Sequence, residues 1–366
     1  MNNLSRIFHQ FRSDVKVKSA ISYGSGHIND TYLVTLEDEK TTYILQRVNH
    51  QIFPNVPELM RNIDGVTQHL RNKFQELPHK DPQKNTLTFF PASSGLLYYQ
   101  DEEGNYWRAM ETITPAKSYD QVETTAQAFQ AGVGIGEFQA LLSDFDGSKL
   151  YEIIPDFHNM ETRLATFRET VKADVSGRVR LSQKEIDFVE DRAELMQTLV
   201  RLGKEGKLPI RVTHNDTKIN NVLLDENDEA LCVIDLDTVM PGFVHYDFGD
   251  AIRTSTNTGA EDDKDLNNVE MDILLFKAYT EGFLSKTADI LTPIEIEYLP
   301  LSARIMTFII GLRFITDYLD GDNYFKTHHE HHNLQRARAQ FKLVESMERQ
   351  FEDMKAVVEN ATLINQ

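Results

Sequence analysis

Two polar segments near the middle of the chain combine residue types that can move a proton and bind a metal ion. In the first, Asp216 is followed five residues later by Asn221, and an apolar run comes next. In the second, an apolar run ends at Asp235. An aspartate in such a loop can accept the proton of an attacking hydroxyl, whereas an asparagine and a second aspartate supply the oxygen ligands that Mg²⁺ prefers. The spacing predicts a phosphotransferase catalytic loop and a metal-binding turn.

A predicted hairpin brings these residues together. Residues 221–224 and 230–235 are strand-like, and the polar residues 225–228 between them are typical of a turn. We expect the hairpin to place Asp235 beside Asn221, so that both meet Asp216 at one site. Turns and caps rich in Asn and Asp also occur without any function. It is the combination of the two segments that favours a metal site.

A glycine-containing loop lies between two predicted strands near the N-terminus, at Gly24-Ser25-Gly26-His27. Glycine lets backbone N–H groups approach phosphate oxygens closely, so this loop is a candidate cover for phosphates. An ordinary hairpin turn is the alternative. A Walker loop is excluded because no Gly-Lys-Ser/Thr follows, and a Rossmann turn is excluded because a strand rather than a helix comes next.

The catalytic segments resemble those of the aminoglycoside phosphotransferase/choline kinase family. The resemblance rests on His214-Asn215-Asp216 with Asn221, and on Ile234-Asp235-Leu236-Asp237, in which no Phe-Gly follows the metal-binding aspartate. It implies an α+β, two-lobed, protein-kinase-like fold with a small β-rich N-terminal lobe and a larger helical C-terminal lobe. It also implies that ATP and Mg²⁺ are used to phosphorylate a small molecule. The later Asp247-Phe248-Gly249 lies outside the hairpin and is not interpreted as the metal segment.

The resemblance implies a role for each matching position. Asp216 is expected to be the catalytic base, and Asn221 and Asp235 the metal ligands. The residues expected to bind ATP are Gly24, Ser25 and Gly26 of the loop and, through their backbone, Met110, Glu111 and Thr112 of the hinge. The residues expected near the acceptor are His27, His214, Asp216, Asp235 and Arg313. For Arg313, an ion pair with Asp317 one helical turn further on is the alternative.

Longer segments resemble, more narrowly, members of the family that act on N-acetylated hexosamines. These segments are residues 24–31, 45–49, 154–159, 235–239, 246–250 and 311–319. They imply that the acceptor is GlcNAc or GalNAc and that it is phosphorylated at the anomeric hydroxyl. The alternatives are another small-molecule kinase, acting on choline, homoserine or an amino sugar, and a nucleotide-binding pseudokinase. A choline site usually needs an aromatic cage, and the one tryptophan, Trp107, lies in the N-terminal lobe.

The third predicted strand departs from the usual pattern of this fold. Kinases of this kind place a lysine there, paired with phosphate and a helix glutamate. Here the strand offers Gln46 and Arg47, whose side chains point to opposite faces. Alignment by the preceding leucine favours Gln46, whereas Arg47 is the chemically natural phosphate ligand, so both stay open. Glu58 and Asp64 are both possible as the helix partner.

These sites require two regions of different structure. Residues 1–112 are expected to form the N-terminal lobe, with a helix at 57–74 and strands at 15–22, 31–36, 43–48, 86–90, 95–99 and 106–111. Residues 113–366 are expected to form the helical lobe. Its predicted helices are 122–142, 185–202 and most of the chain after 266.

Charge and composition limit the possible partners and the compartment. The net charge of −19, from 38 basic and 57 acidic residues, disfavours nucleic acid and anionic lipid, so the expected partners are ATP and a small sugar. One cysteine, Cys232, cannot form an internal disulfide, and no apolar run follows the first residues, so the cytoplasm is expected.

The cluster His328-His329-Glu330-His331-His332 lacks a metal-binding spacing and is predicted to be a solvated loop. The oligomeric state is not indicated.

Overall fold

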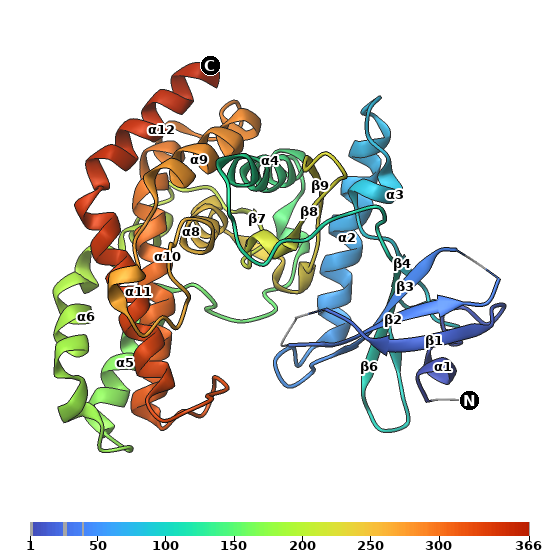
Figure 1. Cartoon of the computed structure of the whole chain (residues 1–366), viewed down its shortest axis with the longest axis horizontal. Helices are drawn as coiled ribbons and strands as arrows, with labels where there is room; N and C mark the ends of the chain where they lie inside the picture. Colours follow the sequence, from blue (N-terminus) through green and yellow to red (C-terminus); the bar gives the residue numbers. More distant parts are fainter. Residues whose placement is uncertain (1–2, 25–27, 39, 366) are drawn as a thin grey trace. The chain divides into compact units, whose positions relative to one another are not determined.

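The computed structural model describes residues 3–24, 28–38 and 40–365, which fall into two compact units. The first unit comprises Met1–Lys117, Asp144–Ile154 and Leu223–Pro241, and the second comprises Ser118–Ser143, Pro155–Val222 and Gly242–Gln366. The predicted N-terminal lobe, 1–112, lies within the first unit, which also takes in two later segments. Each unit is described separately below (Figure 1).

An antiparallel sheet forms the centre of the first unit, with strand order β1-β2-β3-β6-β4 and β5 paired to β6. The strands are β1 (Val17–Ser22), β2 (Asp30–Leu36), β3 (Thr42–Val48), β4 (Phe89–Phe90), β5 (Tyr99–Gln100) and β6 (Tyr106–Glu111). The predicted strands at 15–22, 31–36, 43–48 and 106–111 are confirmed, and the one at 86–90 is reduced to two residues. The strand predicted at 95–99 overlaps the observed β5 only at Tyr99. In this register Gln46 lies opposite Thr31 on one side and opposite Arg108 on the other.

The two faces of the sheet have different cover. On one face, inward side chains such as Val34, Leu45 and Trp107 pack with Ile7 and Phe8 of α1 (Asn3–Phe8). Side chains alternate along a strand, so Gln46 and Arg108 belong to the opposite face. That face meets α2 (Val56–Gln75), which Figure 1 draws alongside the sheet and whose Met60 lies within reach of Arg108. Asn55 caps α2, and its apolar stripe is buried as predicted.

Helices make up most of the second unit. They are α4 (Thr125–Leu141), α5 (Met160–Ala173), α6 (Gln183–Met196), α7 (Thr198–Lys204), α8 (Val244–Ser255), α9 (Ile273–Thr287), α10 (Pro293–Asp320), α11 (His332–Arg349) and α12 (Phe351–Asn365). The predicted helix at 185–202 is in fact two helices. At the break, Gln197 and Thr198 donate side-chain hydrogen bonds to the carbonyls of Ala193 and Leu195, which competes with regular helix geometry.

The remaining elements are short. They are α3 (Pro82–Asn85), β7 (Arg211–Thr213), β8 (Val222–Leu224), β9 (Ala230–Val233), β10 (Met240–Gly242) and the 3₁₀ turns Gly147–Lys149, Val179–Ser182, Ile219–Asn221, Leu236–Thr238 and Leu266–Asn268. β8 and β9 pair with each other, which confirms the predicted hairpin. The Asp225 carboxylate accepts the N–H groups of Asn227 and Glu229 in its turn, as expected for an Asx-type turn.

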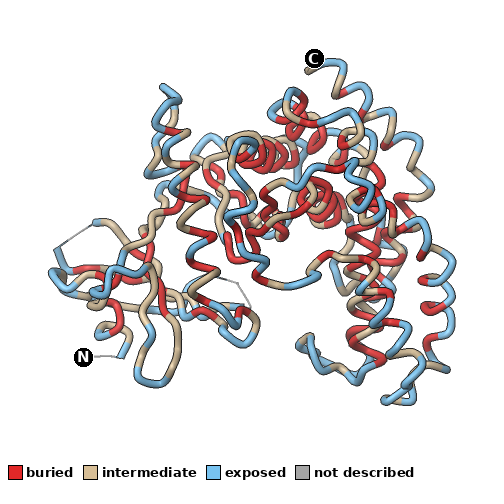
Figure 2. The backbone as a smooth tube through the Cα atoms, turned by 180° about the vertical axis from the view of Figure 1, so that it is seen from behind, coloured by how far each residue is buried: buried red, intermediate tan, exposed pale blue. Residues whose placement is uncertain are grey.

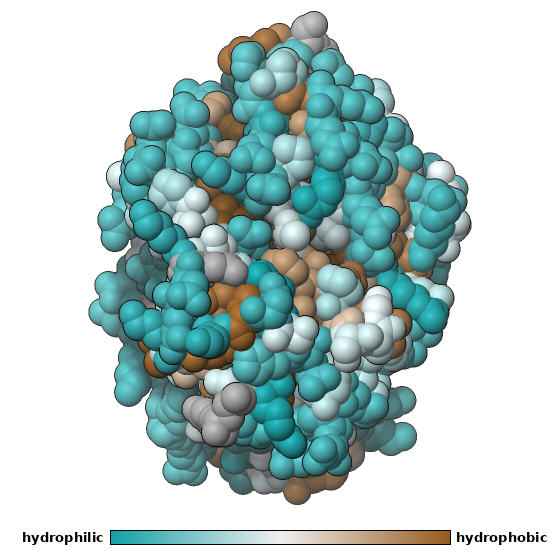
Figure 3. Space-filling model, turned by 90° about the vertical axis from the view of Figure 1, so that its right-hand side faces the viewer, coloured by the Kyte–Doolittle hydropathy of each residue, from teal (hydrophilic) through white to brown (hydrophobic). Residues whose placement is uncertain are grey.

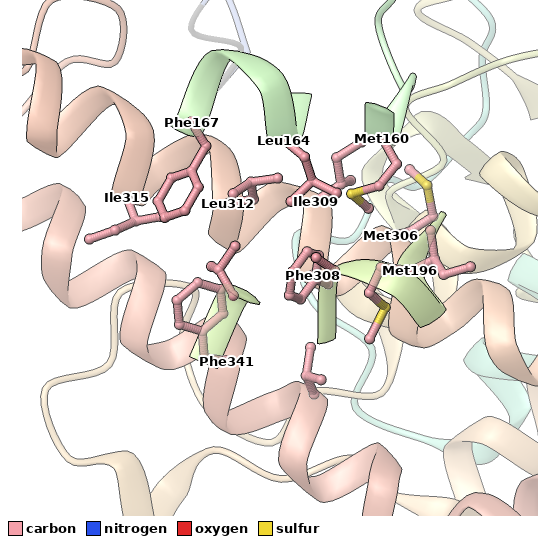
Figure 4. Close-up of a cluster of buried hydrophobic side chains, with 14 of the residues drawn as sticks. Met160, Leu164, Phe167, Met196, Met306, Phe308, Ile309, Leu312, Ile315 and Phe341 are labelled. Atoms are coloured by element: carbon pink, nitrogen blue, oxygen red, sulfur yellow. The ribbon is translucent and has the colours of Figure 1, made fainter. Parts of the chain in front are cut away.

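Helix α10 is the central core element of the second unit. A capping box between Thr292 and Glu295 starts it, and Gly321 ends it in a left-handed conformation, with φ of 100°. Its side chains meet α5, α6 and α11 in one apolar cluster, shown in Figure 4. By length and composition α10 could cross a membrane, yet 83% of the apolar window is buried, as for a core helix. Figure 2 shows the same burial in red, whereas hydrophilic residues cover most of the face in Figure 3.

Helices α4 and α9 approach each other unusually closely. A Cβ added at Gly282 would lie 2.1 Å from the Phe129 carbonyl oxygen, and one at Gly132 would lie 2.2 Å from that of Tyr279. Only glycine fits at these two crossing points. The contact fixes α4, which carries one of the side chains that support the loop described next.

Candidate active site

The loop after β7 holds the predicted base and its asparagine in contact. Asn221 Nδ2 donates to the Asp216 backbone oxygen at 2.8 Å and to its carboxylate at 3.3 Å. Lys218 Nζ lies 3.1 Å from the same carboxylate, whose side chain stays 24% exposed. An amide that donates through Nδ2 keeps Oδ1 as the acceptor a metal ion needs. The structure therefore brings Asp216 and Asn221 together as the sequence predicts, with the carboxylate open to solvent.

Helix α8 holds the backbone of this loop through the Asp247 carboxylate. That carboxylate accepts the N–H groups of His214 at 2.8 Å and Asn215 at 2.7 Å, and the Gln139 amide of α4 at 2.6 Å. Burial raises the pKa of Asp247, and the three donors oppose that effect. Because this carboxylate is buried and occupied by amides, its function is to brace the loop. Asn215 itself has φ of 66°, a left-handed conformation that asparagine tolerates.

A second carboxylate of α8 braces the loop one residue beyond the base. Asp250 accepts the Thr217 N–H at 3.0 Å and forms a buried ion pair with Arg253 at 2.9 Å. Burial acts to raise the pKa of Asp250, but the adjacent Arg253 guanidinium outweighs it and keeps that pKa below its ordinary value. The sequence interpretation assigned no role to Asp247 or Asp250. The available signal was two aspartates, three residues apart, within the buried segment 246–250.

Two histidines pack beside the loop. His214 is fully buried, its ring lies edge-on to Phe138, and its Nδ1 accepts the Asp216 N–H at 3.2 Å. Its predicted position near the acceptor stays a prediction. His158 Nε2 lies 3.4 Å from the Asn215 carbonyl oxygen, and burial lowers its pKa to about 3. His158 is therefore a neutral packing residue under the loop at physiological pH.

The predicted metal turn belongs to the first unit. Asp235 has φ of 60° and precedes the 3₁₀ turn Leu236–Thr238, so its backbone is held in the left-handed region. Asp237 is buried, and its carboxylate accepts Arg108 Nη1 at 2.5 Å and Asn29 Nδ2 at 2.7 Å. Among the described residues no three His, Cys, Asp or Glu side chains gather as a metal cage. Asn221 and Asp235 each carry an oxygen of the type that Mg²⁺ binds, and their joint role as metal ligands stays a prediction.

The other residues predicted to bind ATP also lie in the first unit. Gly24 has φ of 82°, which suits a glycine, whereas Ser25, Gly26 and His27 lie outside the described residues. The backbone N–H of Glu111 donates to Thr88 and that of Thr112 to Thr42. Met110 is buried at the end of β6. Their part in reading adenine stays a prediction.

The alternatives left open on β3 now differ in their surroundings. Arg47 is half-exposed and pairs with Asp30 at the sheet edge. Gln46 faces inward, accepts Arg108 Nε at 3.0 Å and donates to Thr31 at 3.0 Å. Among the described residues, the side-chain partners of Gln46 and Arg47 are Thr31, Arg108 and Asp30, and they include neither Glu58 nor Asp64. Gln46 thus points to the buried face of the sheet and Arg47 to its edge; which of them corresponds to the usual lysine stays a prediction.

Arg313 lies beside three aromatic rings in the second unit. Its guanidinium lies over the rings of Phe157, Tyr324 and Phe325, at 5.3 to 5.7 Å from their centroids. Burial lowers its pKa. The alternative pairing with Asp317 does not form, because that carboxylate accepts the backbone N–H groups of Tyr324 and Phe325. Across residues 3–24, 28–38 and 40–365, no carboxylate lies within ion-pair distance of Arg313.

The histidine cluster is not wholly the predicted solvated loop. His328, His329 and His331 are exposed, but His332 begins α11, is buried, and bonds to Asp262 at 2.9 Å. The prediction was wrong for this last residue because its partner lies 70 residues away in the chain.

The small antiparallel sheet, the helical second unit and the Asp216 loop braced by α8 together define a phosphotransferase with a protein-kinase-like fold. A family model described as "phosphotransferase enzyme family" (APH) matches residues 19–270, and the chain belongs to that family.

Solved structures agree on the fold. An aminoglycoside phosphotransferase from Alicyclobacillus acidocaldarius is 14% identical, with 97% of this chain and 96% of that one covered and a TM-score of 0.62. A choline kinase from Cryptosporidium parvum is 16% identical, with coverage of 96% and 94% and a TM-score of 0.57. A spectinomycin phosphotransferase in complex with ADP and spectinomycin is 14% identical, with coverage of 98% and 96% and a TM-score of 0.54. The predicted α+β, two-lobed kinase-like fold is confirmed.

Proposed function

We propose that this protein is an N-acetylhexosamine 1-kinase, which uses ATP and Mg²⁺ to convert GlcNAc or GalNAc to its 1-phosphate. The observation that carries the kinase assignment is the partly exposed Asp216 carboxylate in contact with Asn221. It lies on a loop whose backbone is fixed by α8, in a chain of a phosphotransferase family. A related fold bound to ADP supports a nucleotide donor. The cytoplasm, where ATP is available, is the compartment we propose.

Arg313 supports a polar, uncharged acceptor. Its guanidinium presents several fixed donors, and the three surrounding rings hold it without a carboxylate among the described residues. Such donors suit sugar hydroxyls or an acetamido carbonyl, whereas a cationic acceptor such as choline would meet a like charge. The segment 311–319, which contains Arg313, also resembles the hexosamine-specific members of the family.

In the proposed reaction, Asp216 orients the anomeric hydroxyl and accepts its proton as the oxygen attacks the γ-phosphorus of ATP. The bond from that phosphorus to the β,γ-bridging oxygen breaks, and ADP leaves with the bridging oxygen. Asn221 and Asp235 would hold Mg²⁺, which neutralises charge on the phosphates when bound. Because α8 fixes the loop backbone in advance, the base needs little reorganisation when the acceptor binds.

A nucleotide-binding pseudokinase is the second candidate, because Gln46 stands where kinases of this fold usually have lysine. Another acceptor within the same fold is the remaining possibility. Incubation with ATP, Mg²⁺ and a panel of free sugars, choline and homoserine, followed by phosphorus NMR, separates the three. A sugar phosphate from GlcNAc or GalNAc supports the proposal. Product from choline or homoserine alone contradicts the sugar assignment, and bound ATP without any product favours the pseudokinase.

A further inference from the structure

A buried arginine in the sheet of the first unit has partners that suggest a task in metal binding. Arg108 of β6 is 2% exposed. Its Nε donates to Gln46 Oε1 at 3.0 Å and its Nη1 to Asp237 Oδ1 at 2.5 Å. A charge taken so far out of water is tolerated only when it is paired and hydrogen-bonded. The ion pair with Asp237 is therefore the reason that this arginine can occupy the sheet face.

The Asp237 carboxylate links three segments of the unit. One oxygen accepts Arg108, and the other accepts Asn29 Nδ2 at 2.7 Å, directly before β2. Asn29 Oδ1 in turn accepts the Asn49 N–H at 3.0 Å, just after β3. Asp237 lies two residues after Asp235, within the turn that follows it. The side chain that fixes this turn is therefore clamped from the sheet on both of its oxygens.

The arrangement replaces a pair that kinases of this fold usually have. Their third-strand lysine pairs with a glutamate of the neighbouring helix. Here β3 presents Gln46, and α2 presents the Met60 sulfur at 3.8 Å from Arg108 Nη1. The positively charged side chain is Arg108 on β6, the strand next to β3. Its carboxylate partner is Asp237 of the metal turn and not a glutamate of the helix. If Arg108 supplies the positive charge, the absence of lysine at position 46 no longer favours a pseudokinase.

We propose that Arg108 is the positioning residue of the metal-binding turn, acting through Asp237 to hold Asp235 in place for Mg²⁺ and the nucleotide phosphates. The inference rests on the proposed function. Arg108 acts through its neighbour because it is enclosed: Gln46 and Asp237 take two edges of the guanidinium, and the Phe89 ring lies 5.7 Å from it. Asp237 is needed equally, because it connects Arg108 to the turn. Gln46 orients the guanidinium from the other side.

The test is the affinity for ADP, measured calorimetrically with and without Mg²⁺, so that no acceptor is needed. For Arg108→Met and Asp237→Asn we expect the Mg²⁺-dependent affinity to fall about 10–100-fold, as for residues that support a metal ligand. Affinity for ADP without Mg²⁺ should change little. Arg108→Lys should recover part of the loss, because lysine keeps the charge but not the fork that spans Gln46 and Asp237.

A double variant that moves the positive charge from β6 back to β3 makes the test more specific. In the double variant Gln46→Lys with Arg108→Gln, the charge returns to the third strand, and Mg²⁺-dependent affinity should exceed that of Arg108→Gln alone. Arg192→Met serves as control, since Arg192 forms an ion pair with Glu348 in the second unit, with side chains that are 22% and 25% exposed. Arg108→Met with wild-type Mg²⁺-dependent affinity overturns the inference, as does an equal loss with and without Mg²⁺. Should that variant not fold, Asp237→Asn and Arg108→Lys decide. Wild-type protein that binds no nucleotide overturns the proposed function itself.

Discussion

The loop that carries Asp216 and the turn that carries Asp235 are fixed by opposite means. In the second unit, the buried carboxylates of α8 accept the backbone N–H groups of His214, Asn215 and Thr217, and these contacts do not involve the Asp216 side chain. In the first unit, Asp237 holds the turn through an ion pair with Arg108 and a bond from Asn29. A reactive side chain in the loop can therefore be exchanged without loss of the loop, whereas the turn depends on individual side chains.

The largest expected effect comes from Asp216→Asn, which removes the base and keeps the shape. Turnover should fall by about 10²–10⁴-fold or more, because a general base contributes that much. Since the loop is held by its backbone, the melting temperature and the affinity for ADP with Mg²⁺ should stay at their wild-type values. A coupled assay for ADP release and a thermal melt check this. Unchanged turnover would show that Asp216 is not the catalytic base. A lower melting temperature would show that the Asp216 side chain itself helps to hold the loop.

Asp247→Ala removes the α8 carboxylate that holds the backbone of the Asp216 loop. It leaves the N–H groups of His214 and Asn215 buried without their acceptor, at a cost of about 1–3 kcal/mol for each. We expect a clear drop in the free energy of unfolding, measured with urea, together with loss of turnover. Asp289→Ala at an exposed site is the matched control and should change neither. A variant at Asp247 with normal stability and turnover would show that the backbone bonds do not hold the loop.

Gly282→Ala tests the close packing of α9 against α4, the helix whose Gln139 bonds to Asp247. The added methyl group would collide with the Phe129 carbonyl and push α9 from α4, which carries Gln139. Overpacking of this kind costs about 1–3 kcal/mol. Gly147→Ala, which has open space around it, should be neutral. If the two alanine variants unfold at the same urea concentration, the close approach of α4 and α9 is not a constraint.

The last expected effect is on the pH dependence of stability. Burial lowers the pKa of His158 from 6.5 to about 3, so below pH 6.5 the unfolded chain binds a proton that the folded protein does not. Acidification from 6.5 towards 3 therefore destabilises the fold, by at most about 1.4 kcal/mol per pH unit from this residue. His245, whose pKa burial lowers to about 4, acts in the same direction.

His158→Gln should flatten the dependence, seen as a smaller difference between urea unfolding at pH 7 and pH 5. His79→Gln, at an exposed position, should leave the difference as in the wild type. An equal pH dependence in all three proteins would mean that the His158 ring is protonated within the fold.

Much of this architecture could be predicted from local patterns. The alternation of β2, β3 and β6, the apolar stripe of α2 and the turn at 225–228 each depend on neighbouring residues, and each is confirmed. The pairing of Asp216 with Asn221 is also local, five residues apart.

What could not be predicted depends on partners far apart in the chain. Arg108 lies within the strand predicted at 106–111, and a charged residue flanked there by Trp107 and Ala109 already calls for a partner. That partner, Asp237, lies 129 residues away. The carboxylate of Asp247 reaches its amides across 33 and 32 residues. Spacing along the sequence carries no information on which of many acidic residues will meet such donors.

The most direct test of the central claim is the position of the phosphate on the product that wild-type protein makes from GlcNAc, ATP and Mg²⁺. Phosphorus–proton coupling in NMR identifies the carbon that bears it. Our account predicts a phosphate at the anomeric carbon, formed by the wild type and not by Asp216→Asn. Phosphate on any other hydroxyl, or the same product from both proteins, would contradict it.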